Sequence, residues 1–459
     1  MKRKLLALLL ATCMLALSLP MLLLPAAAEE TAETMTMDDY LEIAQSLEPK
    51  TDEQRAIRGQ MLVEYTVYQR DIDAADPGLV DTLLAEVAEK HAAYMYEYQY
   101  GFIEKTGLLM TFAVMSDVHI NNSNNTGTMS SAMNGLLEYN PDPIGVFVTG
   151  DLSDNGLYPA NSHYDDLDNY YAFVKNHPFK NSNGEQIKIR SVLGNHDIRG
   201  PWEIGYSKTS YAPAVEMYRE QEGVDTLCYD MWIEGYHFIF MNPAAWASDD
   251  CILTAENISW LDATLSADQS GKPQFVFIHQ YASRVIEGPG SPYTFEEVIA
   301  RHPTTIVSSG HGHYGFDVAF VYEEAGSYYI NQPGLVSNTG VFSAPSYYIV
   351  DVYNGGVIYR ARQASGKWVP EGVVVIPDPS YAEEGKCRYY FYDEDGGLLL
   401  KGVAEKGAAP TVPTAPTKPS DTQNRYTFAG WDINGDGTAD ALPAALSENL
   451  NATAVYTAT

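Results

Sequence analysis

Cysteine is scarce in this sequence, and its scarcity excludes a fold held together by disulfides. Only four cysteines occur in 459 residues, and one of them, Cys13, lies in an apolar N-terminal run. The other three are Cys228, Cys251 and Cys387, and no two of them have the spacing of a metal site. A disulfide between Cys228 and Cys251 would require an oxidising compartment, and the sequence leaves that pairing open.

Basic residues are also few. Lys and Arg number 28 against 60 Asp and Glu, which gives a formal net charge of -32 at pH 7. Such a chain repels nucleic acid and anionic membrane surfaces, so we expect no nucleic-acid partner. The 45% hydrophobic content excludes wholesale disorder, and the length suggests two or three domains.

The N-terminus has the pattern of a secretory signal peptide. The basic Lys2-Arg3-Lys4 precedes an apolar run, Leu5–Leu24, and the small residues Ala26-Ala27-Ala28 follow. We therefore predict a signal peptide over residues 1–28 and a secreted, extracellular or cell-envelope location. Cleavage would move the net charge from -32 to -35, because the segment carries three basic and no acidic residues. The alternative is an uncleaved membrane anchor, since the run is long enough to span a bilayer.

Residues 29–107 have helical patterns and predict an N-terminal helical extension. Thr36 and Asp39 have the spacing of a capping box ahead of the apolar residues Tyr40 and Ile43. Leu79, Leu83 and Val87 repeat at helical spacing in a second segment. Nothing in this region resembles a reactive cluster.

Short apolar runs alternate with helical patterns over residues 108–365 and predict an α/β domain. Within it we expect a helix over residues 253–267 and a β-hairpin over residues 346–363, with its turn at Asn354-Gly355-Gly356. We assign residues 366–385 as a connector to a last block, residues 386–459.

Five of the apolar runs end in polar residues of the kinds that bind metal ions. These ends are Asp117-x-His119, Gly150-Asp151, Gly194-Asn195-His196-Asp197, His279 and Gly310-His311-Gly312-His313. The carboxyl ends of strands in an α/β sheet meet at one crevice, and imidazole and carboxylate are ligands for divalent metals. Each motif alone is weak evidence, whereas all of them in order after separate runs are strong evidence. So many ligands suit two ions that share one carboxylate.

In this order the motifs resemble those of the calcineurin-like metallophosphoesterases. The resemblance covers about residues 108–365 and implies a four-layer α/β/β/α sandwich with a dinuclear centre of Mn, Fe or Zn between its sheets. By that resemblance, the ligands of one metal are Asp117, His119, Asp151 and His313. Those of the other metal are Asp151, Asn195, His279 and His311.

The same resemblance implies hydrolysis of phosphate mono- or diesters by a metal-bridging hydroxide. It assigns His196 as a general acid or charge stabiliser near the leaving oxygen, oriented by Asp154. The alternative for Asp154 is a turn residue, and Asp197 is expected to form a turn or helix cap. Asn155 stands where the protein Ser/Thr phosphatases carry a phosphate-binding Arg, which disfavours phosphoprotein substrates. Arg199 and the aromatic residues of the insert 198–235 are alternative pocket residues.

The last block, 386–459, resembles bacterial surface repeats of the internalin B-repeat type, mainly through "YTFAGWD" at 426–432. The resemblance implies a small β-rich extracellular module for attachment or spacing, with the Pro/Thr stretch Ala409–Ser420 as an internal loop. Residues 432–440 resemble the start of a calcium loop. The twelfth position is Pro443 rather than Glu, which favours a polar turn.

Together these features predict a secreted, metal-dependent phosphoesterase that acts on a small phosphate ester. One alternative is an extracellular surface-binding protein with an inactive phosphoesterase fold. A missing metal ligand would support this alternative, but every expected ligand position is filled. Another is a nuclease or phospholipase-type diesterase, which the acidity of the chain disfavours. The sequence leaves open the natural substrate, the metal identities and the oligomeric state.

Overall fold

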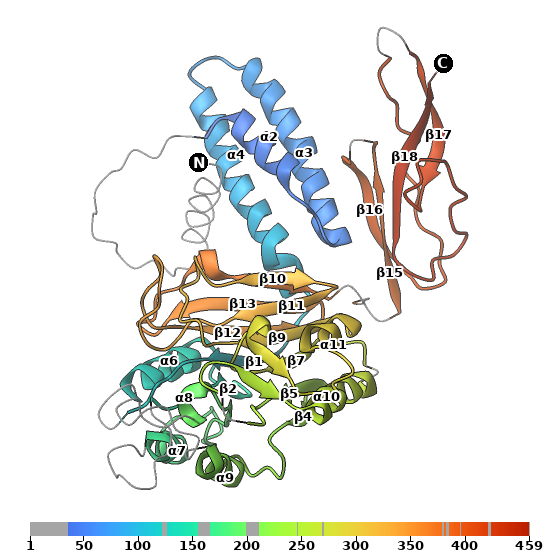
Figure 1. Ribbon diagram of the computed structural model, residues 1–459. Helices are drawn as coiled ribbons and strands as arrows, with labels where there is room; N and C mark the ends of the chain where they lie inside the picture. Colours follow the sequence, from blue (N-terminus) through green and yellow to red (C-terminus); the bar gives the residue numbers. More distant parts are fainter. Residues whose placement is uncertain are drawn as a thin grey trace. The chain divides into compact units, whose positions relative to one another are not determined.

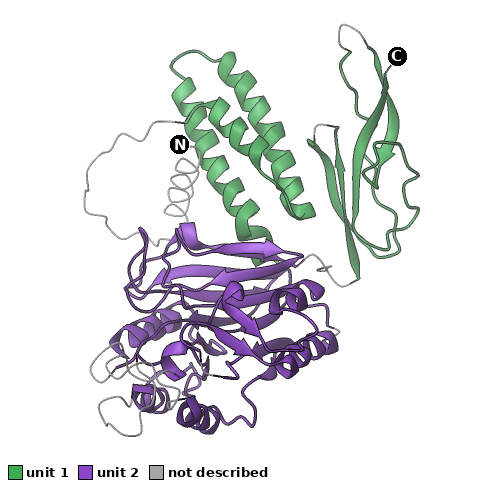
Figure 2. Cartoon of the chain, in the orientation of Figure 1, with its two compact units in different colours: residues 1–106, 379–459 green, residues 107–378 purple. Residues whose placement is uncertain are grey.

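A computed structural model describes residues 35–458 except 122–125, 155–165, 199–210, 246, 269, 379–380, 382–384, 395 and 421–423. The chain divides into two compact units, residues 107–378 and a second unit formed by residues 1–106 with 379–459 (Figure 2). The predicted signal peptide, Asn155 and Arg199 lie outside the described residues. Within the described ranges, no helix has the length and apolar character needed to cross a membrane.

The unit of residues 107–378 contains two six-stranded mixed sheets (Figure 1). The first sheet has the order β14-β13-β12-β1-β2-β3. Its strands are β1 (Leu108–Met115), β2 (Gly145–Thr149), β3 (Ile189–Val192), β12 (Ser346–Tyr353), β13 (Gly356–Gln363) and β14 (Val374–Pro377). The second sheet has the order β10-β11-β9-β7-β5-β4. Its strands are β4 (Tyr229–Ile233), β5 (Tyr236–Phe240), β7 (Gln274–Phe277), β9 (Thr305–Ser309), β10 (Val321–Glu324) and β11 (Ser327–Asn331).

Three apolar clusters define four layers in this unit. The central cluster lies between the sheets, where Phe112 of β1 has its ring 5.2 Å from Phe147 and 5.4 Å from Phe275. A second cluster joins the first sheet to α6 (Thr126–Tyr139), α7 (Asp166–Asn176) and α9 (Tyr211–Glu222). The third joins the other sheet to α10 (Ala255–Ala267) and α11 (Phe295–Arg301). The expected α/β/β/α sandwich is confirmed.

The parallel direction of the central strands brings their carboxyl ends to one end of the sandwich. Strands β1, β2 and β3 are parallel, and so are β5, β7, β9 and β11.

Strands β12 and β13 form the predicted hairpin, in which Tyr353 pairs with Gly356 around a two-residue loop. Strand β14, in the segment assigned as a connector, pairs with β13 at the sheet edge. A short pair of parallel strands, β6 (Cys251–Leu253) and β8 (Val285–Glu287), lies beside the main sheets.

The other unit begins with the helical extension. Helix α2 (Met37–Ser46) starts at the predicted capping box, in which Thr36 and Asp39 each bond the other's backbone. Helix α4 (Val80–Tyr96) runs on through a π-helical turn, η1 (Glu97–Gly101), into α5 (Phe102–Glu104). Helix α3 (Asp52–Asp73) lies within the segment predicted to be helical, although no separate helix was predicted there, and its buried residues include Ile57, Met61 and Tyr65.

The C-terminal block of this unit is a four-stranded sheet with the order β16-β15-β18-β17. Its strands are β15 (Lys386–Tyr392), β16 (Leu398–Glu405), β17 (Tyr426–Asp432) and β18 (Leu450–Ala458). The Pro/Thr stretch connects β16 to β17 within this one sheet. Arg388 of β15 forms an ion pair with Glu53 of α3, so the helices and the sheet of this unit contact each other although they are far apart in the sequence. At residues 432–440, the Asp432 carboxylate accepts backbone hydrogen bonds from Asn434, Gly435 and Gly437, as in a polar turn.

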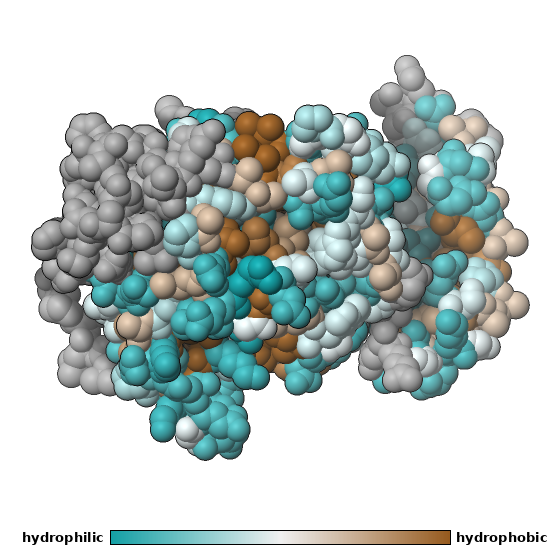
Figure 3. All heavy atoms as spheres, turned by 60° about the horizontal axis from the view of Figure 1, so that its bottom comes forward, coloured by the Kyte–Doolittle hydropathy of each residue, from teal (hydrophilic) through white to brown (hydrophobic). Residues whose placement is uncertain are grey.

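Hydrophilic residues surround smaller hydrophobic patches on the face drawn in Figure 3.

The three described cysteines, Cys228, Cys251 and Cys387, are buried free thiols, so the structure contains no Cys228–Cys251 disulfide.

Candidate metal centre

The polar residues that follow β1, β2, β3, β7 and β9 converge at one place in the unit of residues 107–378. We call Asp117, His119, Asp151 and His313 the first ligand set, and Asp151, Asn195, His279 and His311 the second. Within the first set, one ligand atom of each residue lies within 4.8 Å of the others, and the same holds for Asp151, His279 and His311. Six of the seven residues predicted as ligands are therefore together, Asp151 belongs to both sets, and Asn195 contacts His279 and His311 of the second set.

The first set is held by close approaches between nitrogen and oxygen atoms. His313 Nε2 lies 3.2 Å from Asp117 Oδ1 and 3.1 Å from His119 Nε2. His119 Nε2 lies 3.7 Å from Asp151 Oδ2. Asp117 Oδ1 is buried, and its close neighbours among the described residues are the imidazole nitrogens of His313 and His119, at 3.2 Å and 3.9 Å. A buried carboxylate oxygen left in this way among imidazole nitrogens fits a bound cation.

The second set presents acceptor atoms toward a common point. His279 Nδ1 lies 2.7 Å from the carbonyl oxygen of Thr149, so Nδ1 carries the proton in the neutral ring and Nε2 is available as a ligand. Nε2 lies 3.2 Å from Asp151 Oδ2 and 3.2 Å from Asn195 Oδ1. His311 Nδ1 lies 2.9 Å from the same Asn195 oxygen. A carboxylate, an amide oxygen and two imidazoles form a suitable donor set for a divalent metal.

His196 and Asp154 lie beside the first set, with His119. The His196 ring stands edge-on to the His119 ring at 4.4 Å. His196 Nδ1 donates to the backbone carbonyl of Asp154 at 2.7 Å, whereas the Asp154 carboxylate lies 3.6 Å away. The same carboxylate is 3.5 Å from His119 Nδ1. Asp154 therefore holds His196 through its main chain, and its side chain lies between the two imidazoles.

Asp197 does more than form a turn, because it ties two loops of the site together. It accepts a hydrogen bond from Gly194 N at 2.7 Å, as a turn residue does. It also accepts bonds from Ser153 N at 2.8 Å and Leu152 N at 3.2 Å, in the loop that carries Asp151. Burial raises the pKa of Asp197 to about 6. Adjacency to His196 was the only sequence signal for this role.

The glycines of the motifs allow the loops to approach one another. A Cβ on Gly194 would lie 2.2 Å from Asp151 Oδ1, and one on Gly310 would lie 1.7 Å from Ser116 Oγ. The Ser116 hydroxyl donates to Asp117 Oδ2 at 2.6 Å, so Ser116 is a supporting residue that the motifs did not reveal. These glycines thus provide space for the ligands themselves, beyond a turn at the strand end.

The backbone at the ligands is strained. Eight described non-glycine residues have positive φ, and five of them are predicted ligands. These five are Asp117 (50°), His119 (47°), Asp151 (46°), His311 (71°) and His313 (47°). A left-handed residue costs roughly 1–2 kcal/mol, less for Asp, and such residues persist where the surrounding structure holds them, often at functional sites.

The shifted pKa values of Asp117 and His279 show that the buried carboxylates of the site favour positive charge beside them. Burial raises the pKa of Asp117, but the hydrogen bond with His313 and the charge of His279 outweigh it and lower that pKa to about 2. Burial lowers the pKa of His279, but the Asp151 carboxylate outweighs it and raises that pKa to about 9. The two buried carboxylates thus attract positive charge, which protons or metal ions can supply.

Residues 110–315 match the family described as calcineurin-like phosphoesterase, and this range contains every predicted ligand. No curated protein matches the sequence. The similar solved structures include GAP50, the anchor in the inner membrane complex of Plasmodium, with 13% identity over 59% of this chain and 89% of that one, and a TM-score of 0.41. The phosphoesterase Yfce from E. coli has 12% identity over 58% and 100% of the two chains, with a TM-score of 0.29. A predicted phosphoesterase from Streptococcus pneumoniae has 13% identity over 58% and 97%, with a TM-score of 0.26.

Proposed function

We propose that this chain, which contains a calcineurin-like phosphoesterase domain over residues 110–315, hydrolyses phosphate esters at a dinuclear metal centre. The observation that carries the proposal is the convergence of two ligand sets on one shared carboxylate, Asp151. Two metal ions bridged by a carboxylate are a recurrent arrangement for in-line displacement at phosphorus.

The donor sets suit borderline to hard cations such as Mn, Fe or Zn. When bound, such ions neutralise phosphate charge and lower the pKa of water, which supplies a nucleophile at neutral pH. Asp151 adds negative charge to both sites, and Asn195 contributes a neutral amide oxygen that leaves more of the cation's charge for the phosphate. Thr149 and Ser116 hold His279 and Asp117 through the bonds described above.

His196 is proposed as the group that protonates the leaving oxygen. Its Nδ1 is engaged with the Asp154 carbonyl, and its Nε2 lies 4.0 Å from Asp151 Oδ2, on the side of the metal centre. Its side chain is 20% exposed, so a substrate that enters from solvent can reach it. A proton on Nε2 would pass to the alcohol oxygen as the P–O bond breaks, and Asp154 would keep the ring oriented.

The first experiment is an assay of the purified protein with p-nitrophenyl phosphate and bis(p-nitrophenyl) phosphate. We expect turnover with added Mn and its loss in excess chelator. Turnover of only one ester would assign mono- or diester preference. Absence of turnover with Mn, Fe, Zn and Co would contradict the proposal and favour the surface-binding alternative.

A second experiment separates the ligand role from the proton-transfer role. Asp151→Asn should lower metal content and turnover together, because Asp151 belongs to both sets. His196→Ala should reduce turnover by about 10²–10⁴-fold while most of the metal content remains. Equal metal loss in the two variants would show that His196 is a ligand, contrary to the assignment.

We further propose that the enzyme acts outside the cytoplasm, on a small ester, with residues 386–459 as an attachment or spacing module. The support is the signal-peptide pattern of residues 1–28 and the repeat-like sequence of the last block. Expression with and without residues 1–28, followed by fractionation, tests the location. A full-length protein that stays in the cytoplasm would contradict it.

A further inference from the structure

A cavity lies beside the metal centre, within the unit of residues 107–378. Its volume is about 280 Å³. One wall comes from the segment after His279, which leads into the short 3-10 helix η4 (Ala282–Arg284), and the other from β9, β10 and β11 with the loop before β10. The lining residues are Tyr281, Ala282, Ser283, Ser309, Phe320, Tyr322, Tyr329 and Asn331.

The cavity adjoins the second ligand set at two points. Tyr281 lines the cavity, and its ring centre is 5.8 Å from that of His311. Ser309, also in the lining, directly precedes Gly310-His311. The organic part of an ester whose phosphate lies at the metal centre can therefore reach this cavity past a single ring.

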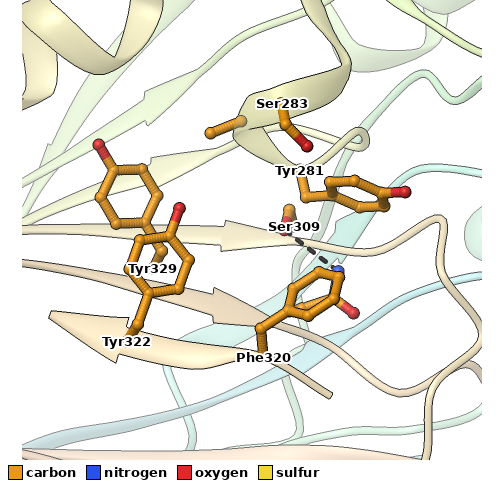
Figure 4. Close-up of a pocket in the computed structure, with 8 residues that line it drawn as sticks. Tyr281, Ser283, Ser309, Phe320, Tyr322 and Tyr329 are labelled. Carbon is orange, nitrogen blue, oxygen red and sulfur yellow. Dashed lines mark hydrogen bonds between the residues drawn. The ribbon is translucent and has the colours of Figure 1, made fainter. Parts of the chain in front are cut away.

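Aromatic rings dominate the lining (Figure 4). Tyr322 and Tyr329 stack at 4.7 Å with 9° between their planes. Tyr281 and Phe320 meet edge to face at 5.2 Å. Figure 4 shows these two pairs on either side of Ser309. Phe320 and Tyr322 are each 38% exposed, so both retain ring surface that a ligand can cover.

Asn331 gives the cavity one directional polar group. Its side chain is 1% exposed, and its Nδ2 donates to the Gly310 carbonyl at 2.6 Å and to Ser309 Oγ at 3.3 Å. These bonds fix which end of the amide is oxygen. That oxygen, Oδ1, is buried and accepts no hydrogen bond from any described residue. Because this oxygen is covered, an N–H group of a ligand would reach it once the neighbouring side chains shift.

The lining carries no charged side chain. The nearest charges, Arg284 beside Tyr281 and Glu324 beside Tyr322, lie outside this lining, and the exposed aromatic surface suits the stacking of a planar ring. The exposed rings and the unsatisfied amide oxygen together suit a planar heterocycle with an amino group, which is the chemistry of adenine or cytosine.

We propose that this cavity binds the base of a nucleoside phosphate and so determines which esters the enzyme hydrolyses. The inference rests on the proposed phosphoesterase function. Tyr281, Phe320 and Tyr322 would contact the faces and edges of the base, and Asn331 Oδ1 would accept a hydrogen bond from its amino group.

The test compares kcat/KM for adenosine 5′-monophosphate and ribose 5-phosphate, with Mn, in the full-length protein. We expect the nucleotide to be preferred by about tenfold or more, equal to about 1.4 kcal/mol. Purine riboside 5′-monophosphate, which lacks the amino group, should fall between the two. Equal kcat/KM for all three esters would overturn the inference.

Variants assign the preference to the cavity. Phe320→Ala should lower kcat/KM for the nucleotide by about tenfold and leave ribose 5-phosphate within about twofold, which is the scale of one lost base–ring stack. Trp232→Ala is the matched control, because Trp232 is a 51% exposed ring on β4, at the opposite edge of the same sheet from β10. Equal losses in both variants, or on both substrates, would overturn the assignment.

A binding measurement keeps the two proposals separable. Adenosine binding is followed by calorimetry in wild type and Phe320→Ala. If no ester is hydrolysed but adenosine binds and Phe320→Ala weakens that binding, the phosphoesterase proposal fails and the base site stands. If p-nitrophenyl phosphate is hydrolysed but adenosine neither binds nor confers preference, only the base site is wrong.

Discussion

Substitution of Gly194 by Ala tests whether the close approach of two loops holds the metal centre together. Gly194 lies between β3 and the short helix α8 (Asn195–Ile198). An added Cβ would lie 2.2 Å from Asp151 Oδ1, 2.4 Å from Asp151 N and 2.8 Å from His279 Cδ2. Gly194 is not among the residues with positive φ, so the effect of Ala is steric and not a matter of backbone conformation.

The size of the effect follows from these contacts. Non-bonded heavy atoms pack at about 3.5–4.0 Å, so Asp151 or the Gly194 loop must move by about 1 Å or more. Overpacking of this kind costs about 1–3 kcal/mol of stability. A displacement of about 1 Å at reacting groups lowers turnover by about 10²-fold. A shift of the Asp151 carboxylate, which both ligand sets share, should also weaken metal binding by about 10–100-fold.

The assay measures turnover against Mn concentration, bound metal and thermal unfolding for three proteins. The control is Gly127→Ala in α6, where an added Cβ meets no atom of a described residue within 4 Å and Ala is the better helix former. Gly127→Ala should match wild type in all three measurements. If Gly194→Ala retains wild-type metal content and turnover, the approach of this loop to Asp151 is not required, and the reasoning is refuted.

Three further predictions concern charge and stability. Burial raises the pKa of Glu222 to about 7, despite Arg190 at 3.3 Å. Because the folded chain keeps this proton more tightly than the unfolded chain, the free energy of unfolding should fall by up to about 3 kcal/mol as pH rises from about 4.5 to 7. Glu222→Gln should flatten that slope in denaturant titrations at several pH values, and Glu220→Gln, at an exposed position of the same helix, should not. Burial lowers the pKa of His91 to about 4, so the unfolded chain takes up a proton first and stability should fall by about 2 kcal/mol from pH 7 to 5; a wild-type pH slope in His91→Phe would contradict this. A chelator should lower the unfolding temperature, because it removes ions that offset the charges of the buried Asp117 and Asp151. At a metal concentration of 100 Kd, bound metal stabilises the folded state by about 2.7 kcal/mol, and Asp117→Asn should reduce the shift in unfolding temperature.

The convergence of the site was predictable because it depends on local sequence and one general property of sheets. Each of Asp117, Asp151 and His279 follows an apolar run, and the ends of parallel strands meet at one edge. The hairpin at residues 346–363 was predictable for a similar reason, since its turn residues specify a two-residue loop.

The supporting contacts were not predictable, because they join residues that only the fold brings together. The Thr149 carbonyl that fixes the His279 tautomer is a main-chain atom with no sequence signal. Asp197 looked like a turn residue because its own loop is visible in sequence, whereas its bonds to Leu152 and Ser153 are not. Helix α3 and the C-terminal sheet likewise contact each other through Glu53 and Arg388, which are 335 residues apart in the sequence.

The alternative of an inactive, surface-binding fold conflicts with how the site is built. Five predicted ligands are held in left-handed backbone conformations, and two buried carboxylates stand among imidazole nitrogens. The left-handed conformations cost stability, and the buried carboxylates need positive charge from metal ions or protonated imidazoles to offset their burial. A binding surface elsewhere on the molecule gains nothing from that arrangement. If the chelator prediction fails and the metal-free protein is as stable as the loaded one, this reasoning loses its physical basis and the binding alternative gains support.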